Sequence, residues 1–235
     1  MNGPIETLLF DFGGTLDADG VAWKERFHAL YRADGLDVAS DAFAPAFYAA
    51  DDPLVGSLPS KTDLAGTVHA LTVNLESELV RRHSGTRAEG GGDRGRRIAS
   101  GFMSDSAATF ERNRPVLKAL SERYRLGIVS NFYGNLKAVC ESAGLGSFFK
   151  VMVDSHCVGV EKPDPAIFRV ALERLGATPE KTVFIGDSLR RDREGARRMG
   201  MRFIWIAPRD IQAGQNERQA EPAVAELRDV VKVLQ

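Results

Sequence analysis

Four segments that lie far apart in this sequence carry side chains able to act together in catalysis. Asp11 follows an apolar run, Ser130 ends another, and Lys162 directly precedes a proline. The fourth segment holds two acids, Asp187 and Asp192, after a further apolar run. A carboxylate can attack an electrophilic centre and form a covalent intermediate, and neighbouring carboxylates supply the hard oxygen ligands that Mg²⁺ prefers. The set predicts a Mg²⁺-dependent hydrolytic site.

Five short apolar runs are predicted to be the strands that position these residues. Their hydrophobicity is nearly continuous rather than alternating, which is typical of a parallel sheet covered on both faces. The runs are Ile5 to Phe10, Arg125 to Ser130, Val151 to Val153, Thr182 to Ile185 and Arg202 to Ile206. Four of them end in, or lead into, a polar segment. Because ligands of open α/β sheets bind beyond the carboxyl ends of the strands, we expect these polar residues to converge.

Helical patterns alternate with the strands from residue 125 onward, so the sequence predicts an α/β core with a doubly wound, mostly parallel five-stranded sheet. The predicted helices are Pro165 to Leu175, capped by Asp164 and ended by Gly176, about Leu189 to Met199, about Gly134 to Ala143, and Pro222 to Leu234.

The chain between the first two strands has a different character. It shows helical spacing of apolar residues and few strand signals. We therefore predict a core domain over 1–16 and 107–235 and an inserted α-helical cap domain over 17–106. A Gly-rich stretch from Ser84 to Gly95 is predicted to be a mobile turn between two cap helices.

The four polar segments resemble the signature motifs of the haloacid dehalogenase (HAD) superfamily. They read LLFDFGGTL at 8–16, IVSN at 128–131, EKPDPAIF at 161–168 and IGDSLRRD at 185–192. They occur in the order that the superfamily has, and the helical insert follows the first motif, as in members with a cap at that position. The resemblance covers roughly residues 5–16 and 114–208.

This resemblance implies a role for each matching catalytic residue. Asp11 corresponds to the nucleophile, which forms an aspartyl intermediate and divides one difficult displacement into two easier steps. Ser130 and Lys162 would hold the transferring group, because a hydroxyl can donate to phosphoryl oxygens and an ammonium neutralises their charge.

The resemblance also implies a Mg²⁺ cofactor and a set of binding residues. Asp11, the backbone carbonyl of Gly13 and Asp187 would hold the ion, with Asp192 supporting it directly or through water. The residues implied to bind substrate are Gly14, Thr15 and Asn131. The substrate is expected to be a small phosphorylated metabolite.

Gly13 departs from the pattern of the phosphatases in this superfamily. They usually carry a second Asp at this position, which protonates the leaving group and then activates water. A glycine cannot transfer a proton, and losing a general acid and base costs about 10²–10⁴-fold in rate. A slow or selective phosphatase remains the leading expectation, with water, a good leaving group or a cap residue in the missing role. The cap candidates are Lys24, Glu25 and His28.

Three alternatives stay open at this point. A 2-haloacid dehalogenase also lacks the second Asp, but it has an aromatic residue in place of Gly13 and usually lacks the paired acids of the fourth motif. A carbon–phosphorus hydrolase acting on phosphonoacetaldehyde needs a cap lysine, for which Lys24 and Lys61 are the candidates. A catalytically impaired binding or regulatory module has no need to retain the four catalytic motifs.

Composition limits the partners. The chain has 235 residues, 43% of them hydrophobic, and a formal net charge of −1, so it is expected to be globular and to attract neither nucleic acid nor an anionic membrane. It has no apolar run of the roughly 18 residues that span a bilayer. Two cysteines, Cys140 and Cys157, are expected to be reduced. We expect a soluble, cytoplasmic protein, and the sequence carries no signal for its oligomeric state.

Overall fold

A computed structural model describes residues 3–83, 93–213 and 221–234. Its core is a six-stranded sheet with the strand order β3-β2-β1-β4-β5-β6, and each neighbouring pair is parallel. The strands are β1 Thr7–Phe10, β2 Arg125–Ser130, β3 Val151–Asp154, β4 Thr182–Gly186, β5 Arg202–Ile206 and β6 Ala223–Val224. The predicted α/β fold with a parallel sheet is confirmed.

The predicted count of five strands is wrong, because β6 adds a sixth at one edge. Only two residues of β6 pair with β5, where Trp205 lies opposite Ala223 and Ile206 opposite Val224. A two-residue strand shows no periodicity, so the sequence could not reveal it. The helix predicted over Pro222 to Leu234 is therefore also wrong. Its place is taken by β6, the short turn η7 (Leu227–Asp229) and α10 (Val230–Val233).

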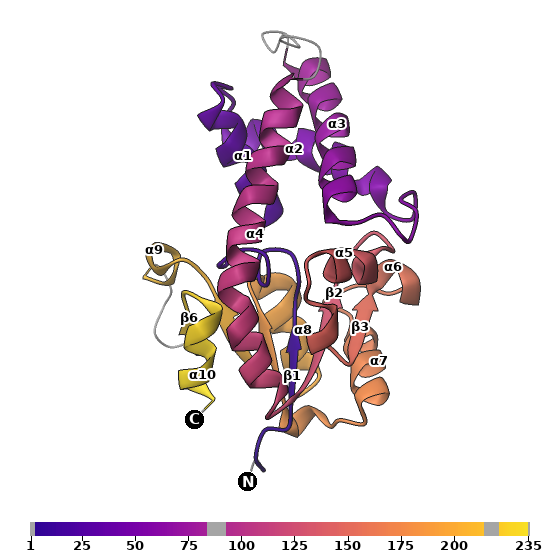
Figure 1. Cartoon of the computed structure of the whole chain (residues 1–235), viewed down its shortest axis with the longest axis vertical. Coiled ribbons are helices and arrows are strands. Elements are labelled where there is room, and N and C mark those ends of the chain that lie inside the picture. Colours follow the sequence, from indigo (N-terminus) through magenta and orange to yellow (C-terminus); the bar gives the residue numbers. More distant parts are fainter. Residues whose placement is uncertain (1–2, 84–92, 214–220, 235) are drawn as a thin grey trace.

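Helices cover both faces of the sheet, as the continuous apolar strands require. Leu8 and Phe10 of β1 pack into a large cluster with residues of α4 (Asp93–Ser121), α5 (Leu136–Ser142) and α10. Leu9, which points to the other face, packs with α7 (Pro165–Leu175) and α8 (Glu194–Arg198). Figure 1 shows α4 running alongside the sheet on one side and α7 on the other.

The other predicted helices of the core are present, with changes at their ends. The helix Pro165–Leu175 has the predicted bounds, and Asp164 caps it by accepting a hydrogen bond from the Ala166 N–H at 2.8 Å. The stretch from Leu189 begins as a π-helix, η5 (Leu189–Arg193), before α8. The remaining short elements are η3 Gly146–Phe148, α6 Ser155–Val158, η4 Pro179–Lys181 and α9 Arg209–Gln212.

The insert after β1, which we call the cap, is helical, as predicted. It consists of α1 (Trp23–Ala33), α2 (Ser40–Asp51), η1 (Asp52–Leu54), α3 (Leu64–Arg82) and the first half of α4. In Figure 1 these helices gather around one end of α4, whose other end packs against the core. Helix α4 crosses position 106/107, where we predicted the domain boundary. Most of the predicted Gly-rich turn, residues 84–92, lies outside the described residues.

Two further observations concern the described chain as a whole. Cys140 and Cys157 are both free thiols, as expected, and Cys140 is buried. Among the described helices, none combines the length and the apolar composition needed to cross a bilayer.

A buried ion pair connects the loop after β1 to the cap. Asp17 accepts hydrogen bonds from the Gly14 backbone N–H and from the Trp23 indole N–H, each at 2.7 Å. Arg26 of α1 forms an ion pair with Asp17 at 2.7 Å, and its guanidinium also donates to Ser106 Oγ of α4 at 2.7 Å. Asp17 is fully buried and Arg26 nearly so. The loop that follows Asp11 is thereby held against two cap helices.

We expect Asp17→Asn to lower the free energy of unfolding by about 3–5 kcal/mol, because it leaves the buried Arg26 guanidinium without its counter-charge. Asp19→Asn is the matched control. Asp19 pairs with Arg112 at a more exposed position, so its loss should cost less than about 1 kcal/mol. Urea unfolding of the two variants measures the difference, and similar small losses in both would show that the buried pair contributes little.

Candidate active site

The carboxyl ends of three neighbouring strands bring the predicted residues together. Asp11 directly follows β1, Ser130 ends β2, and Asp187 directly follows β4. Because β1 lies between β2 and β4, these positions meet at one edge of the sheet. The strand order reverses beside β1, which places the residues at the crevice where open α/β sheets bind ligands.

Lys162 lies at the centre of this group. Its Nζ is 2.7 Å from Asp11 Oδ1 and 2.7 Å from Asp192 Oδ1. Ser130 Oγ donates a hydrogen bond to the same Asp11 oxygen at 2.7 Å. All four side chains are buried, with Lys162 exposing 3% of its surface. These four residues come from all four sequence motifs. The structure thus brings Ser130, Lys162 and Asp192 together around Asp11, the predicted nucleophile.

Asp187 is held by groups on two neighbouring segments. Thr15 Oγ1 donates to Asp187 Oδ1 at 2.9 Å, and the backbone carbonyl of Asp187 accepts from the Trp205 indole N–H at 2.8 Å. Gly14 has a φ of +89°, and a Cβ at this position would lie 2.7 Å from Asp187 Oδ2. Glycine is therefore required at 14 by both backbone conformation and close approach. In this structure the Thr15 hydroxyl orients an acid of the site.

Asn131 positions Lys162 through the main chain. Its Oδ1 accepts from the Lys162 N–H at 2.7 Å, and its Nδ2 donates to the Lys162 carbonyl at 3.1 Å. This pair of hydrogen bonds fixes the loop that carries Lys162 against the loop after β2. Asn131 also lines the cavity over the site, so its predicted contact with substrate stays a prediction beside this structural role.

The positive charge of Lys162 does not balance the three neighbouring acids, Asp11, Asp187 and Asp192. Burial raises the pKa of Asp187 well above its usual range, and the neighbouring carboxylates of Asp11 and Asp192 raise it further. Burial also raises the pKa of Asp192, against the opposing effect of the Lys162 ammonium. For Lys162, burial favours the neutral amine, but the two carboxylates outweigh it and raise its pKa. Lys162 thus remains charged, while the acids favour a further cation.

The donor set fits a Mg²⁺ ion. Asp11, Asp187 and Asp192 each offer a carboxylate oxygen, and these oxygens lie within 4.8 Å of one another. Within the described residues, the Gly13 carbonyl accepts no hydrogen bond and remains available as a ligand. Oxygen-only donors around a site of net negative charge are what Mg²⁺ prefers.

A cavity of about 240 Å³ lies over this site between the core and the cap. The core contributes Asp11, Gly13, Ser130, Asn131 and Lys162 among others. The cap and the neighbouring loops contribute charged and aromatic groups that include Lys24, Glu25, Tyr48, Asp51, Tyr133 and Arg191. Asp51, Tyr133 and Arg191 line this cavity although they were not among the predicted site residues. Arg191 lies within the fourth motif, which was the one available signal.

The predicted proton donors from the cap are not equally placed. Lys24 and Glu25 line the cavity and form an ion pair with each other at 3.0 Å. His28 does not line it. Its ring packs against Phe43, with centroids 4.9 Å apart, and its Nε2 lies 2.7 Å from the Val38 carbonyl oxygen. The structure therefore brings two of the three candidates to the site.

Gly13 faces the indole of Trp23. A Cβ at position 13 would lie 3.2 Å from Trp23 Nε1 and 3.4 Å from its Cδ1. The indole is fixed in turn by its hydrogen bond to Asp17. A Cβ at position 13 would require the ring to shift by a few tenths of an ångström, so the loop and the cap fit closely around a glycine.

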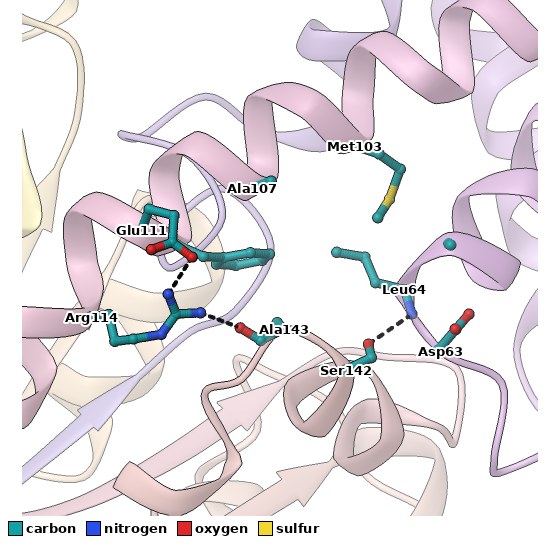
Figure 2. Close-up of a pocket in the computed structure, with 10 residues that line it drawn as sticks. Asp63, Leu64, Met103, Ala107, Glu111, Arg114, Ser142 and Ala143 are labelled. Carbon is teal, nitrogen blue, oxygen red and sulfur yellow. Dashed lines mark hydrogen bonds and ion pairs between the residues drawn. The ribbon is translucent and has the colours of Figure 1, made fainter.

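A second cavity, of about 300 Å³, lies between α3, α4 and α5 (Figure 2). On one side Arg114 pairs with Glu111 and donates to the Ala143 carbonyl at 3.2 Å, and on the other Ser142 Oγ accepts from the Leu64 N–H at 3.3 Å. The predicted site residues do not line it. Its polar groups satisfy one another, so the candidate active site is the smaller cavity at the strand ends.

Comparisons with known proteins agree with the geometry. The family model "haloacid dehalogenase-like hydrolase" matches residues 5–200. A phosphoserine phosphatase of Thermus thermophilus is 31% identical over 163 residues, which are 65% of this chain and 63% of that protein. The haloacid dehalogenase-like hydrolase domain-containing protein 3 of Bos taurus is 31% identical over 183 residues, 75% of this chain and 71% of that protein. The chain thus spans just under two thirds of the phosphatase and somewhat more of the bovine protein.

The fold of this chain is also similar to that of solved protein structures. A 2-haloacid dehalogenase from Pseudomonas syringae superposes with a TM-score of 0.52 and 21% sequence identity, over 98% of each chain. At this level of identity the likeness concerns the fold alone.

Mg²⁺ should stabilise the protein, and more at pH 7.5 than at pH 5. The pKa values of Asp187 and Asp192 are raised in the folded protein. Without metal, the free energy of unfolding therefore falls as the pH rises above about 4, the pKa of an aspartate in the unfolded chain. The bound ion offsets this loss and, at a hundred times its Kd, adds about 2.7 kcal/mol. Thermal unfolding with and without Mg²⁺ at both pH values measures the effect.

Asp187→Asn tests the location of the ion. The variant should lose the Mg²⁺-dependent shift, and without metal it should be at least as stable as the native protein, because one buried charge has been removed. Asp164→Asn, which keeps a helix-capping side chain outside the cavity, should retain the shift. An unchanged shift in Asp187→Asn would place the ion elsewhere.

Proposed function

The chain belongs to the haloacid dehalogenase-like hydrolase family, and from this we propose that it is a Mg²⁺-dependent phosphatase that acts on a small phosphorylated metabolite. The observation that carries the proposal is the buried contact of Asp11 with Lys162 and Ser130, beside two further acids. Such a site combines a nucleophile, donors for phosphoryl oxygens and ligands for a divalent ion.

The residues act in two half-reactions. In the first, Asp11 attacks phosphorus and forms an aspartyl-phosphate as the bond to the leaving oxygen breaks. Lys162 and Ser130 donate to the phosphoryl oxygens, and the Lys162 charge opposes the repulsion between the phosphate and the carboxylates. In the second, water attacks phosphorus, and Asp11 is released with inorganic phosphate. When bound, Mg²⁺ neutralises negative charge on the phosphoryl group and on the acids.

Ser130 and Lys162 donate to the same Asp11 oxygen. Their donors hold the carboxylate in one orientation, which supports in-line attack. The second carboxylate oxygen of Asp11 has no hydrogen bond within the described residues, which leaves it available to act as the nucleophile.

The acidic cluster favours transfer of a phosphoryl group over displacement of a halide. Halide displacement needs no metal, and three carboxylates within 4.8 Å of one another have no use in it. The cavity of about 240 Å³ suits a small metabolite rather than a polymer. The phosphoserine phosphatase among the relatives is consistent with that class of substrate.

Asp11→Asn should abolish phosphate release, with a loss on the order of 10³-fold or more, because the amide cannot form the covalent intermediate. The assay measures inorganic phosphate released from 4-nitrophenyl phosphate with and without Mg²⁺. Asp164→Asn is the control and should keep activity within about twofold of native. Turnover that continues in Asp11→Asn, or that ignores chelation of Mg²⁺, would contradict the proposal.

A further inference from the structure

The cap contributes a carboxyl group whose environment differs from that of the other acids in the cavity. Asp51 is the last residue of α2 and lines the cavity together with Asp11 and Gly13. Its Oδ1 accepts a hydrogen bond from the Tyr133 hydroxyl at 2.5 Å. Within the described part of the chain, its Oδ2 takes no hydrogen bond. One oxygen of this cavity-lining carboxyl group is therefore free of hydrogen bonds to the described residues.

Tyr133 ties this carboxyl group to the catalytic loop of the core. Tyr133 lies three residues after Ser130, in the loop that follows β2. Besides the contact of its hydroxyl with Asp51, its backbone carbonyl accepts from the Gly56 N–H of the cap at 3.0 Å. Two hydrogen bonds, one from the side chain and one from the main chain, thus fix the end of α2 relative to the loop that holds Ser130.

The surroundings of Asp51 favour a carboxyl group that holds its proton to a higher pH than an ordinary aspartate does. Burial raises its pKa to about 6, and the adjacent Asp52 acts in the same direction, while the Tyr133 hydrogen bond and the Arg191 guanidinium oppose the rise. Asp51 also ends a helix, where the negative end of the helix dipole disfavours an anion. General acids work best when their pKa lies near the working pH.

The other ionisable groups on the cap side of the cavity are less suited to proton transfer. Glu25 is half exposed and paired with Lys24. The pKa of Lys24 is raised, chiefly by its hydrogen bond to Glu25, so the ammonium is a poor acid. Arg191 keeps its charge, because Asp11 and the neighbouring acids outweigh the effect of its burial. Asp51 is the group that combines a pKa raised toward neutrality with a position fixed to the core.

We propose that Asp51 supplies the general acid and base that the core lacks at Gly13. The inference rests on the phosphatase function proposed above. It assigns the role to a cap residue because a side chain at 13 would meet the buried Trp23 indole, whereas Asp51 already faces the cavity.

Proton transfers by Asp51 balance both half-reactions. As the Asp11 oxygen forms its bond to phosphorus, the bond from phosphorus to the leaving oxygen breaks, and Asp51 gives its proton to that oxygen. An alcohol leaves, and Asp51 becomes a carboxylate. It then removes a proton from the water whose oxygen attacks the aspartyl-phosphate. The bond to Asp11 breaks, inorganic phosphate leaves, and Asp51 is again protonated.

A comparison of leaving groups tests the proposal. Phenolate is a poorer leaving group than 4-nitrophenolate, so it depends more on an acid. In Asp51→Asn, which keeps an acceptor for Tyr133, kcat/KM for phenyl phosphate should fall about 100-fold or more, and for 4-nitrophenyl phosphate less than about tenfold. A burst of 4-nitrophenol equal to the enzyme concentration should also appear, because hydrolysis of the aspartyl-phosphate has lost its base.

Asp37→Asn removes one carboxylate from an exposed residue of the loop between α1 and α2, which does not line the cavity, and should leave both substrates within about twofold of native. Equal losses on the two substrates in Asp51→Asn would show a structural role and overturn the proposal. A selective loss in Glu25→Gln instead would assign the acid to Glu25 and overturn it equally.

The native protein provides a measurement that does not depend on the folding of any variant. With an acid in place, the kcat/KM values of the native protein for phenyl phosphate and 4-nitrophenyl phosphate should differ by less than about tenfold. A much larger difference between the two leaving groups would overturn the role of Asp51. Native and Asp11→Asn proteins are assayed in parallel. Turnover that is lost in Asp11→Asn but unchanged in Asp51→Asn would overturn this inference alone. If no turnover depends on Asp11, the proposed function is overturned as well.

Discussion

The ammonium of Lys162 is the group on which the site depends. It lies 2.7 Å from a carboxylate of Asp11 and 2.7 Å from one of Asp192, in a region from which water is largely excluded. Without it, three buried carboxylates would repel one another at short range, at a cost of several kcal/mol. The core is arranged to keep this charge in place, since Asn131 fixes the Lys162 backbone with two hydrogen bonds. A divalent cation would complete the balance of charge.

The cap takes part in the same site through buried polar contacts. Asp17 and Arg26 fasten the loop after β1 to α1 and α4, and Tyr133 fastens the loop after β2 to the end of α2. These contacts help to fix which cap groups line the cavity. A phosphatase that takes its proton donor from the cap would couple turnover to the position of the cap, because an open cap would withdraw the acid from the leaving group.

The glycine at position 13 is explained by packing as well as by chemistry. Trp23 occupies the space next to it, and its indole is fixed by Asp17. The aromatic residues of the cap form a continuous cluster with this indole, in which Trp23 and Phe27 both pack against Phe102. Movement of Trp23 to admit a longer side chain would therefore disturb the cap core. Glycine at 13 thus gives the closest fit between the loop after β1 and the cap.

Local patterns in the sequence were sufficient for the core and its acids. The strands Arg125–Ser130 and Arg202–Ile206 have the predicted bounds, because buried parallel strands are short and continuously apolar. Asp11 was found because a strand end identifies the functional edge of an α/β sheet. No local pattern marked Asp51 or β6. An acid at a helix end and a two-residue strand carry no local signal. The position of each depends on a partner distant in the chain, which is Tyr133 for Asp51 and β5 for β6. The sequence determined the sheet and the chemistry at its edge, whereas only the tertiary structure decided which cap groups face it, because that depends on contacts between segments that no local pattern encodes.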